Sequence, residues 1–247
     1  MRKLHDIEGE AIMEIVAGRI VASMALAACL AFTGPATSQE RVSPQGANVP
    51  NLSGTWMPEA WSTDEWPLEP PYSEAGRAAQ AHWAAHPEQD PSYACIVPLG
   101  RILSAPLPFE IIQQPDRVTL LYEYDHQVRR VYLDGRGHPD SYPTLMGHSI
   151  GRWEGDTLVI ETANLEPGYL RPQGMPYSRE TRLTERLTLV DGGERLRAEI
   201  VIDDPVYYAK TWGVTKYYRR TDEEIKDYEC IVREHVPADG GSQGEGS

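Results

Sequence analysis

Glu185 is the charged residue whose sequence context differs most from that of a surface side chain. The strand predicted over residues 182–190 places this glutamate on the face that carries three leucines. A carboxyl group among apolar side chains has a raised pKa, because desolvation disfavours its charged form, and such a group suits general acid or base catalysis. The alternative is a structural carboxylate paired with an arginine of a neighbouring strand, for which Arg130 and Arg152 are the candidates.

Three histidines are candidates for moving protons near neutral pH, where an unperturbed imidazole titrates. His148 begins a predicted strand, His126 lies near a hairpin tip, and His138 lies in a loop. Each has the alternative of being a surface histidine or a hydrogen-bonded core histidine. Their spacing indicates no metal site, and His82 and His86, one helical turn apart, lack a third ligand. The candidate catalytic residues are Glu185, His148, Asp134 and His126.

Arginine and aromatic side chains on the predicted strands could bind a ligand. A guanidinium can orient a carboxylate, phenol or carbonyl group, and ring faces can hold an apolar body. Asp134 would orient the substrate or the base. The alternatives are a solvated exterior face for the charged residues and plain core positions for the tryptophans. The candidate binding residues are Arg130, Arg152, Tyr122, Tyr132, Trp153 and Trp212.

The sequence also bears on two other kinds of catalytic site, a serine nucleophile and a pair of carboxylates. Ser149 follows His148 but lacks the Gly-x-Ser-x-Gly turn of an activated serine. A carboxylate pair for glycoside hydrolysis, drawn from Glu161, Glu185 and Asp134, remains open because the separation of the carboxylates decides that chemistry.

Composition restricts the partners. The 247 residues carry a formal net charge of −14, which argues against nucleic acid and anionic membrane surfaces. No glycine and lysine motif for phosphate groups is present in the sequence, so neither a nucleotide nor another cofactor is predicted. The expected partner is a small hydrophobic or aromatic molecule.

The N-terminus has the pattern of a secretion signal. Arg19 precedes thirteen mostly apolar residues, 20–32, a run too short to span a bilayer comfortably. Small residues follow, so we predict a signal peptide over residues 1–38, cut near Ser38, and a periplasmic or secreted protein. Residues 39–50 are expected to be a flexible lead-in.

Two alternatives concern this N-terminal region, and a flexible segment is expected at the other end. Acidic residues precede Met13, so either Met1 or Met13 could be the true start. Residues 26–29 resemble a lipobox, which would make Cys29 a lipid anchor and the one membrane contact of the protein. Residues 237–247, rich in glycine and serine, are expected to be a disordered tail.

Cys95 and Cys230 are the cysteines that remain after removal of the signal peptide. Two cysteines in an exported chain most simply form one disulfide. A reactive thiol is the alternative, but neither cysteine has a histidine beside it.

Short runs of alternating apolar and polar residues, separated by turn signals, predict antiparallel strands. Hairpins are expected over residues 118–134, 147–162 and 182–203. One helix is predicted to begin after Ser73 and to end at Pro87.

We therefore predict a mainly β protein, a single antiparallel β-barrel of the lipocalin or calycin kind over residues 51–236, with one short helix near its start. Closure into a barrel removes exposed strand edges. Gly54-x-Trp56 resembles the motif that opens lipocalins, in which the tryptophan plugs one end of the barrel.

Asp-Gly-Arg-x-His at residues 134–138 and Trp-Glu-Gly-Asp-Thr-Leu-Val at residues 153–159 resemble a widespread group of exported bacterial proteins, known mainly as hypothetical proteins. The similarity covers residues 50–232 and implies one exported domain with a disulfide. It implies no particular activity. Tyr177 stands where the group often has a histidine, and Asp203 where it often has a glutamate, so a catalytic role of that histidine would not carry over.

The residues favour a cofactor-independent enzyme that performs an acid–base step, such as that of a lyase, isomerase or dehydratase, on a small apolar or aromatic compound. Glu185 and His148 would move protons from one shared pocket, while Arg130 and Asp134 orient the substrate or the base. The alternatives are a binding or carrier protein for a hydrophobic ligand, and a structural envelope protein whose barrel is filled by side chains.

Overall fold

The computed structural model of the chain describes residues 49–59, 66–67, 69–171, 174–228 and 230. The predicted signal peptide with Cys29, nearly all of the lead-in and the predicted tail lie outside the described residues.

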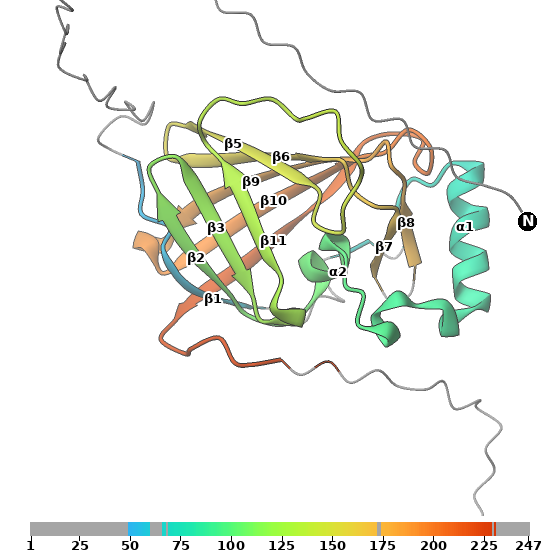
Figure 1. Cartoon of the computed structure of the whole chain (residues 1–247), viewed down its shortest axis with the longest axis horizontal. Coiled ribbons are helices and arrows are strands. Elements are labelled where there is room, and N and C mark those ends of the chain that lie inside the picture. Colours follow the sequence, from blue (N-terminus) through green and yellow to red (C-terminus); the bar gives the residue numbers. More distant parts are fainter. Residues whose placement is uncertain (1–48, 60–65, 68, 172–173, 229, 231–247) are drawn as a thin grey trace, which may run out of the picture. The chain divides into compact units, whose positions relative to one another are not determined.

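Nine strands form a closed barrel, which confirms the mainly β prediction (Figure 1). Their order around the ring is β1-β11-β10-β9-β6-β5-β4-β3-β2, and β2 pairs with β1 to close it. The strands are β1 (Gly54–Pro58), β2 (Phe109–Gln114), β3 (Arg117–Tyr122), β4 (Val128–Tyr132), β5 (His148–Glu154), β6 (Thr157–Ala163), β9 (Arg182–Val190), β10 (Arg195–Asp203) and β11 (Trp212–Thr221).

The prediction that all strands pair antiparallel is wrong at β4 and β5, which run parallel through Val131 opposite Ser149 and Tyr132 opposite Ile150. An odd number of strands in a closed ring cannot alternate in direction all the way round, so one neighbouring pair must be parallel. A parallel pair needs a long connection that returns to the starting end. Residues 133–147 provide it, as the long yellow-green loop at the top of Figure 1.

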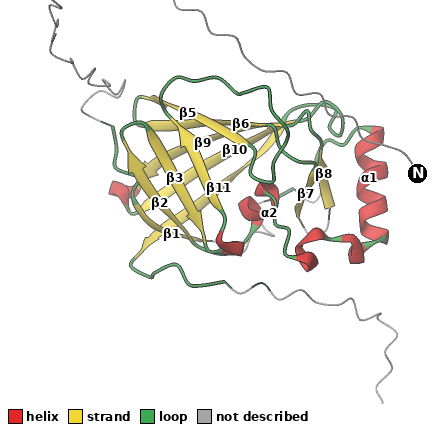
Figure 2. Ribbon diagram, viewed as in Figure 1, coloured by secondary structure: helices red, strands yellow, loops and turns green. Residues whose placement is uncertain are grey.

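Two α-helices accompany the barrel (Figure 2). The helix α1 (Glu74–Ala85) begins as predicted, because the Ser73 side chain accepts a hydrogen bond from the backbone N–H of Gly76, and Pro87 follows its end. The helix α2 (Leu99–Ser104) was not predicted, and all of its residues are buried. The 3₁₀ helices are η1 (Pro87–Gln89), η2 (Pro91–Ala94), η3 (Tyr124–His126) and η4 (Asp191–Gly193).

A second, two-stranded sheet of β7 (Gly168–Arg171) and β8 (Gly174–Tyr177) lies outside the barrel beside α1 (Figure 1). The rings of Trp83 in α1 and Tyr169 in β7 stack with centroids 3.7 Å apart.

Among the described residues, no helix is long and apolar enough to span a membrane.

Alternation along each strand fills the interior of the barrel with side chains. The register of the hairpin formed by β9 and β10 is the predicted one, with Leu187 opposite Ala198 and Leu183 opposite Ile202. The largest fully buried side chains include Trp56, Arg129, Lys216, Ile111, Leu158 and Ile160.

Gly54 and Trp56 form one packing unit with Arg220 of β11. The Arg220 guanidinium lies over the Trp56 ring, 4.3 Å from its centroid, and donates to the carbonyl of Ser53 at 2.7 Å. A Cβ at Gly54 would lie 2.6 Å from Arg220 Nη1, and the φ of +130° at Gly54 also favours glycine. The motif therefore needs glycine because the arginine occupies the space of a side chain.

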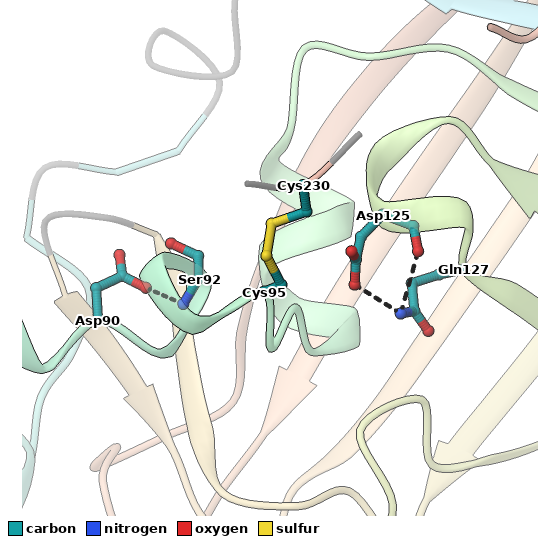
Figure 3. The surroundings of a disulfide bond; sticks show 6 residues. All are labelled: Asp90, Ser92, Cys95, Asp125, Gln127 and Cys230. Atoms are coloured by element: carbon teal, nitrogen blue, oxygen red, sulfur yellow. Dashed lines mark hydrogen bonds between the residues drawn. A yellow bond between two sulfur atoms is a disulfide. The ribbon is translucent and has the colours of Figure 1, made fainter. Parts of the chain in front are cut away.

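Cys95 and Cys230 form a disulfide, as predicted, with Cα atoms 5.8 Å apart. Figure 3 shows the bond next to η2, where Cys95 follows Ala94 as the C-cap of this 3₁₀ helix. It links the segment that leads into α2 to the chain beyond β11.

We predict that Gly54→Ala lowers the free energy of unfolding by about 1–3 kcal/mol, because the backbone is strained and Arg220 must move. Urea unfolding followed by circular dichroism measures the loss. Gly135→Ala is the matched control, since Gly135 has a φ of +78° but nothing within 4 Å of its added Cβ. An equal loss in both variants would show that the packing of Arg220 contributes nothing.

Replacing both cysteines by serine should lower the free energy of unfolding by about 4–5 kcal/mol, the chain-entropy value for a loop that spans 135 residues. Guanidinium unfolding of the oxidised, reduced and serine proteins measures it. Equal midpoints for the oxidised and reduced proteins would contradict the prediction.

Candidate functional site

A small cavity lies inside the barrel, next to α2. It leaves about 20 Å³ for the centres of water molecules, which is room for about one water. Most of its wall is apolar, and Glu185 is the charged residue in that wall. The lining residues are Ile102, Leu103, Ala105, Leu107, Phe109, Leu120, Tyr122, Glu185, Leu187, Ala198 and Tyr218.

Glu185 points into the barrel, as the strand pattern predicts. It lies opposite Ile160 of β6 and Ile200 of β10 in the strand register, and 3% of its surface is exposed. A charged carboxylate at such a position needs a partner of opposite charge.

That partner is Arg129 of β4, and not Arg130 or Arg152 as the sequence suggested. Arg129 Nη2 forms an ion pair with Glu185 Oε2, and both side chains are almost fully buried. Arg130 is exposed, because residues next to each other on a strand face opposite sides of the sheet. Arg129 shares its inward face with Val131 and Leu133, an apolar pattern that could have identified it from the sequence.

Two hydroxyl groups extend the network around Arg129, whose Nη1 is buried without a hydrogen-bond partner among the described residues. Its Nε donates to Ser149 Oγ of β5 at 2.9 Å, and its Nη2 donates to Thr162 Oγ1 of β6 at 2.7 Å. The two hydroxyls are themselves 2.8 Å apart and hydrogen-bonded. Four consecutive strands of the ring, β4, β5, β6 and β9, are thus joined through polar side chains inside the barrel. Arg129 and Thr162 were not identified from the sequence, and Ser149 was considered there only as a nucleophile.

One oxygen of Glu185 remains available to the cavity. Oε2 takes part in the ion pair, whereas Oε1 accepts no hydrogen bond from any residue that the structure describes. Since Glu185 lines the cavity, Oε1 is the oxygen that a molecule there would meet. Because Glu185 is paired with an arginine, its free oxygen Oε1 is presented to the cavity as a hydrogen-bond acceptor.

Tyr122 lies in the same wall and supplies a neutral phenol. Burial raises the pKa of Tyr122 to about 12; the charge of Arg129 opposes this rise, and that of Glu185 adds to it. The cavity wall therefore offers a carboxylate oxygen as an acceptor together with the phenols of Tyr122 and Tyr218, in otherwise apolar surroundings.

His148 does not share this pocket, so the expected pairing with Glu185 is wrong. Its neighbour Ser149 faces inward, and His148 therefore faces outward. Its Nδ1 lies 2.9 Å from Nδ1 of His138, and its ring stacks on Tyr132.

Asp134 and Tyr132 belong to that outer group as well. Asp134 forms an ion pair with Arg136, whose guanidinium lies 3.9 Å from the centroid of the Tyr132 ring. The guanidinium holds the pKa of Asp134 down at about 2. Asp134 and Tyr132 are therefore not placed to orient a molecule in the cavity.

His126 and Arg152 also lie away from the cavity. His126 is exposed, and its Nε2 accepts a hydrogen bond from the backbone N–H of Tyr228 at 3.1 Å. Arg152 forms exposed ion pairs with Glu154 and Glu161 on the outer surface of the barrel.

The two candidate tryptophans are packing residues. Trp212 belongs to the second hydrophobic cluster, where its ring contacts those of Trp66 and Tyr208. Trp153 is partly buried against the barrel core but is not part of the cavity wall. Of the sequence candidates, the cavity brings together Glu185 and Tyr122.

A glycosidase-type carboxylate pair is also ruled out for these candidates. Glu161 and Asp134 have side chains that are 43% and 37% exposed, whereas that of Glu185 is 4% exposed. Two carboxylates that flank one scissile bond must face the same cavity.

Within the described part of the chain, no group of three or more histidine, cysteine, aspartate or glutamate side chains could hold a metal ion. No protein-family model matches the chain, and no curated protein matches it in sequence.

Replacing Arg129 by Met should lower the free energy of unfolding by about 3–5 kcal/mol, because it leaves Glu185 buried without its partner. The double variant Arg129→Met/Glu185→Leu should recover most of this loss. Urea unfolding measures both values.

Arg152→Met is the matched control, since its ion pairs are exposed and worth less than about 1 kcal/mol. A loss for Arg129→Met no larger than that of the control would show that the interior ion pair is not needed.

Proposed function

We propose that this protein is an exported β-barrel that binds a small, largely apolar molecule through a hydrogen-bond donor and removes a proton from it with Glu185. The observation that carries the proposal is the unpaired Oε1 of a buried, arginine-held carboxylate in the wall of an apolar cavity. Export is supported by the signal-like residues 20–32 and by the disulfide, which suits an oxidising compartment.

A purely structural ion pair would have all of its polar atoms satisfied, because an unpaired buried polar atom costs free energy, whereas Arg129 Nη1 is buried without a hydrogen-bond partner among the described residues. Here one oxygen is left for a ligand or a water. The cavity is small, so an aromatic ligand needs side chains of α2, such as Ile102 and Leu103, to move aside.

The chemistry follows from the charges. Arg129 is paired with Oε2 and fixes the orientation of the carboxyl group, so Oε1 is the oxygen left to accept a hydrogen bond or a proton from a bound molecule. The neutral phenol of Tyr122 can donate a hydrogen bond to the ligand, or to the negative charge that develops on it. This combination suits the proton abstraction of a cofactor-independent lyase, isomerase or dehydratase.

The mode of ligand binding would then resemble that of a lipocalin, in which the strands of the barrel enclose the ligand. The closed barrel and the buried Trp56 of the Gly-x-Trp motif support this comparison. The second candidate is a carrier that holds the same ligand without changing it, which the apolar wall favours equally.

Binding is tested with three probes of similar size: phenol, benzene and benzoate. Protein NMR titrations should give the tightest binding for phenol, which can donate to Oε1, and the weakest for benzoate, which Glu185 repels. Glu185→Gln should remove the discrimination against benzoate. Glu161→Gln, on the outer surface, is the matched control and should leave the order unchanged.

Proton abstraction is tested by incubating small ketones and aldehydes with the protein in heavy water, with deuterium incorporation followed by NMR. Glu185→Gln should abolish incorporation in a protein whose fold is verified by circular dichroism, and Tyr122→Phe should slow it about 10²-fold or more. Binding by the wild-type protein without incorporation favours the carrier. The absence of binding by every probe would contradict both functions.

A further inference from the structure

The contact between β4 and β5 is the weakest point of the barrel wall. It is the parallel contact of the ring, and two residue pairs make it, whereas the β9–β10 contact has nine. Parallel pairing is also slightly less stable per residue than antiparallel pairing. We call this contact the seam.

Side chains reinforce the seam on both sides. Inside the barrel, Arg129 of β4 donates to Ser149 of β5. Outside, the crossover loop of residues 133–147 is attached to the neighbouring chain, where the Asn164 side-chain amide donates to the Pro139 carbonyl at 2.9 Å and the Thr144 backbone N–H donates to the Asn164 carbonyl at 2.9 Å.

Backbone hydrogen bonds from Glu166 to Thr144 and from Leu99 to Leu145 hold the loop as well, and a further attachment is the contact between His138 of the crossover loop and His148, the first residue of β5. Their Nδ1 atoms are 2.9 Å apart, and the ring centroids are 5.1 Å apart. A hydrogen bond between two imidazole nitrogens needs one of them to carry a proton and the other to be free of one. The contact therefore survives with both rings neutral or with one charged, but not with both charged.

We propose that His138 and His148 form a pH-sensitive latch, which holds the crossover loop over the seam and opens it when both rings are protonated. The latch goes beyond the proposed function, because it does not require Glu185 to act as a base. It would control how firmly β5, and with it Ser149, is held against β4.

The surroundings of the pair determine the direction of the pH effect. Burial lowers the pKa of His138, the charges of His148 and Arg182 lower it further, and Glu161 opposes them. Burial also lowers the pKa of His148, as does the charge of Arg136, while Asp134 opposes them. The remaining neighbour is the ring of Tyr132, which stacks on His148.

Both histidines thus bind protons more weakly in the folded protein than in the unfolded chain. Their contribution to stability is fully present above the ordinary histidine pKa of about 6.5 and is lost as the pH falls through the lower folded values. The latch is closed at neutral pH and opens in acid.

Hydrogen exchange measured by mass spectrometry, near pH 7.5 and near pH 5, tests the latch. After correction for intrinsic exchange, peptides from residues 133–147 and from β5 should lose protection at least about fivefold in acid, as expected for one lost hydrogen bond. Peptides from β9 and β10 should not change. Equal protection of the loop and β5 at both pH values would overturn the proposal.

His138→Leu and His148→Leu should exchange rapidly in the same peptides at both pH values, with the pH dependence lost. The double variant His82→Gln/His86→Gln is the matched control, because these stacked histidines of α1 and its cap lie outside the barrel. It should keep the wild-type profile. A pH dependence that persists in His138→Leu would assign the effect to other groups and overturn the latch.

Discussion

The ion pair between Arg129 and Glu185 is the interaction on which the rest of the barrel depends. It connects β4 to β9 through the interior, across the two strands that lie between them in the ring. Removing two charges from water is expensive, and the cost is offset only by close pairing and additional hydrogen bonds. Ser149 and Thr162 supply those bonds from the intervening strands, so the buried charges acquire their partners only once the barrel has closed.

The same ion pair accounts for the chemical character of the cavity. Arg129 holds one oxygen of Glu185 and leaves the other toward apolar walls, where a hydrogen bond or a proton transfer is not weakened by bulk water. The interior is otherwise densely filled by side chains such as Trp56 and Lys216. The barrel interior therefore combines a buried ion pair with little open space.

An odd number of strands explains the outer group of polar residues. Nine strands require one parallel pair, the parallel pair requires a crossover, and the crossover carries Asp134, Arg136 and His138 across the outer surface to His148. Motifs that are separated in sequence meet there without contributing to the cavity. The charged residues Asp134, Arg136 and Arg152 thus lie on the outer surface, and Glu185, less conspicuous in the sequence, lies in the cavity wall.

The amino-acid sequence by itself determined the local features: the helix that begins after Ser73, the hairpins, the inward direction of Glu185 and the disulfide. These follow from periodicity, capping and cysteine count, which are properties of neighbouring residues or of composition. Only the tertiary structure decided which arginine meets Glu185 and that His148 faces outward. A period of two defines two faces of a strand, but which face becomes the interior depends on how nine strands close. Contacts such as that between Arg129 and Glu185, 56 residues apart, exist only after that closure.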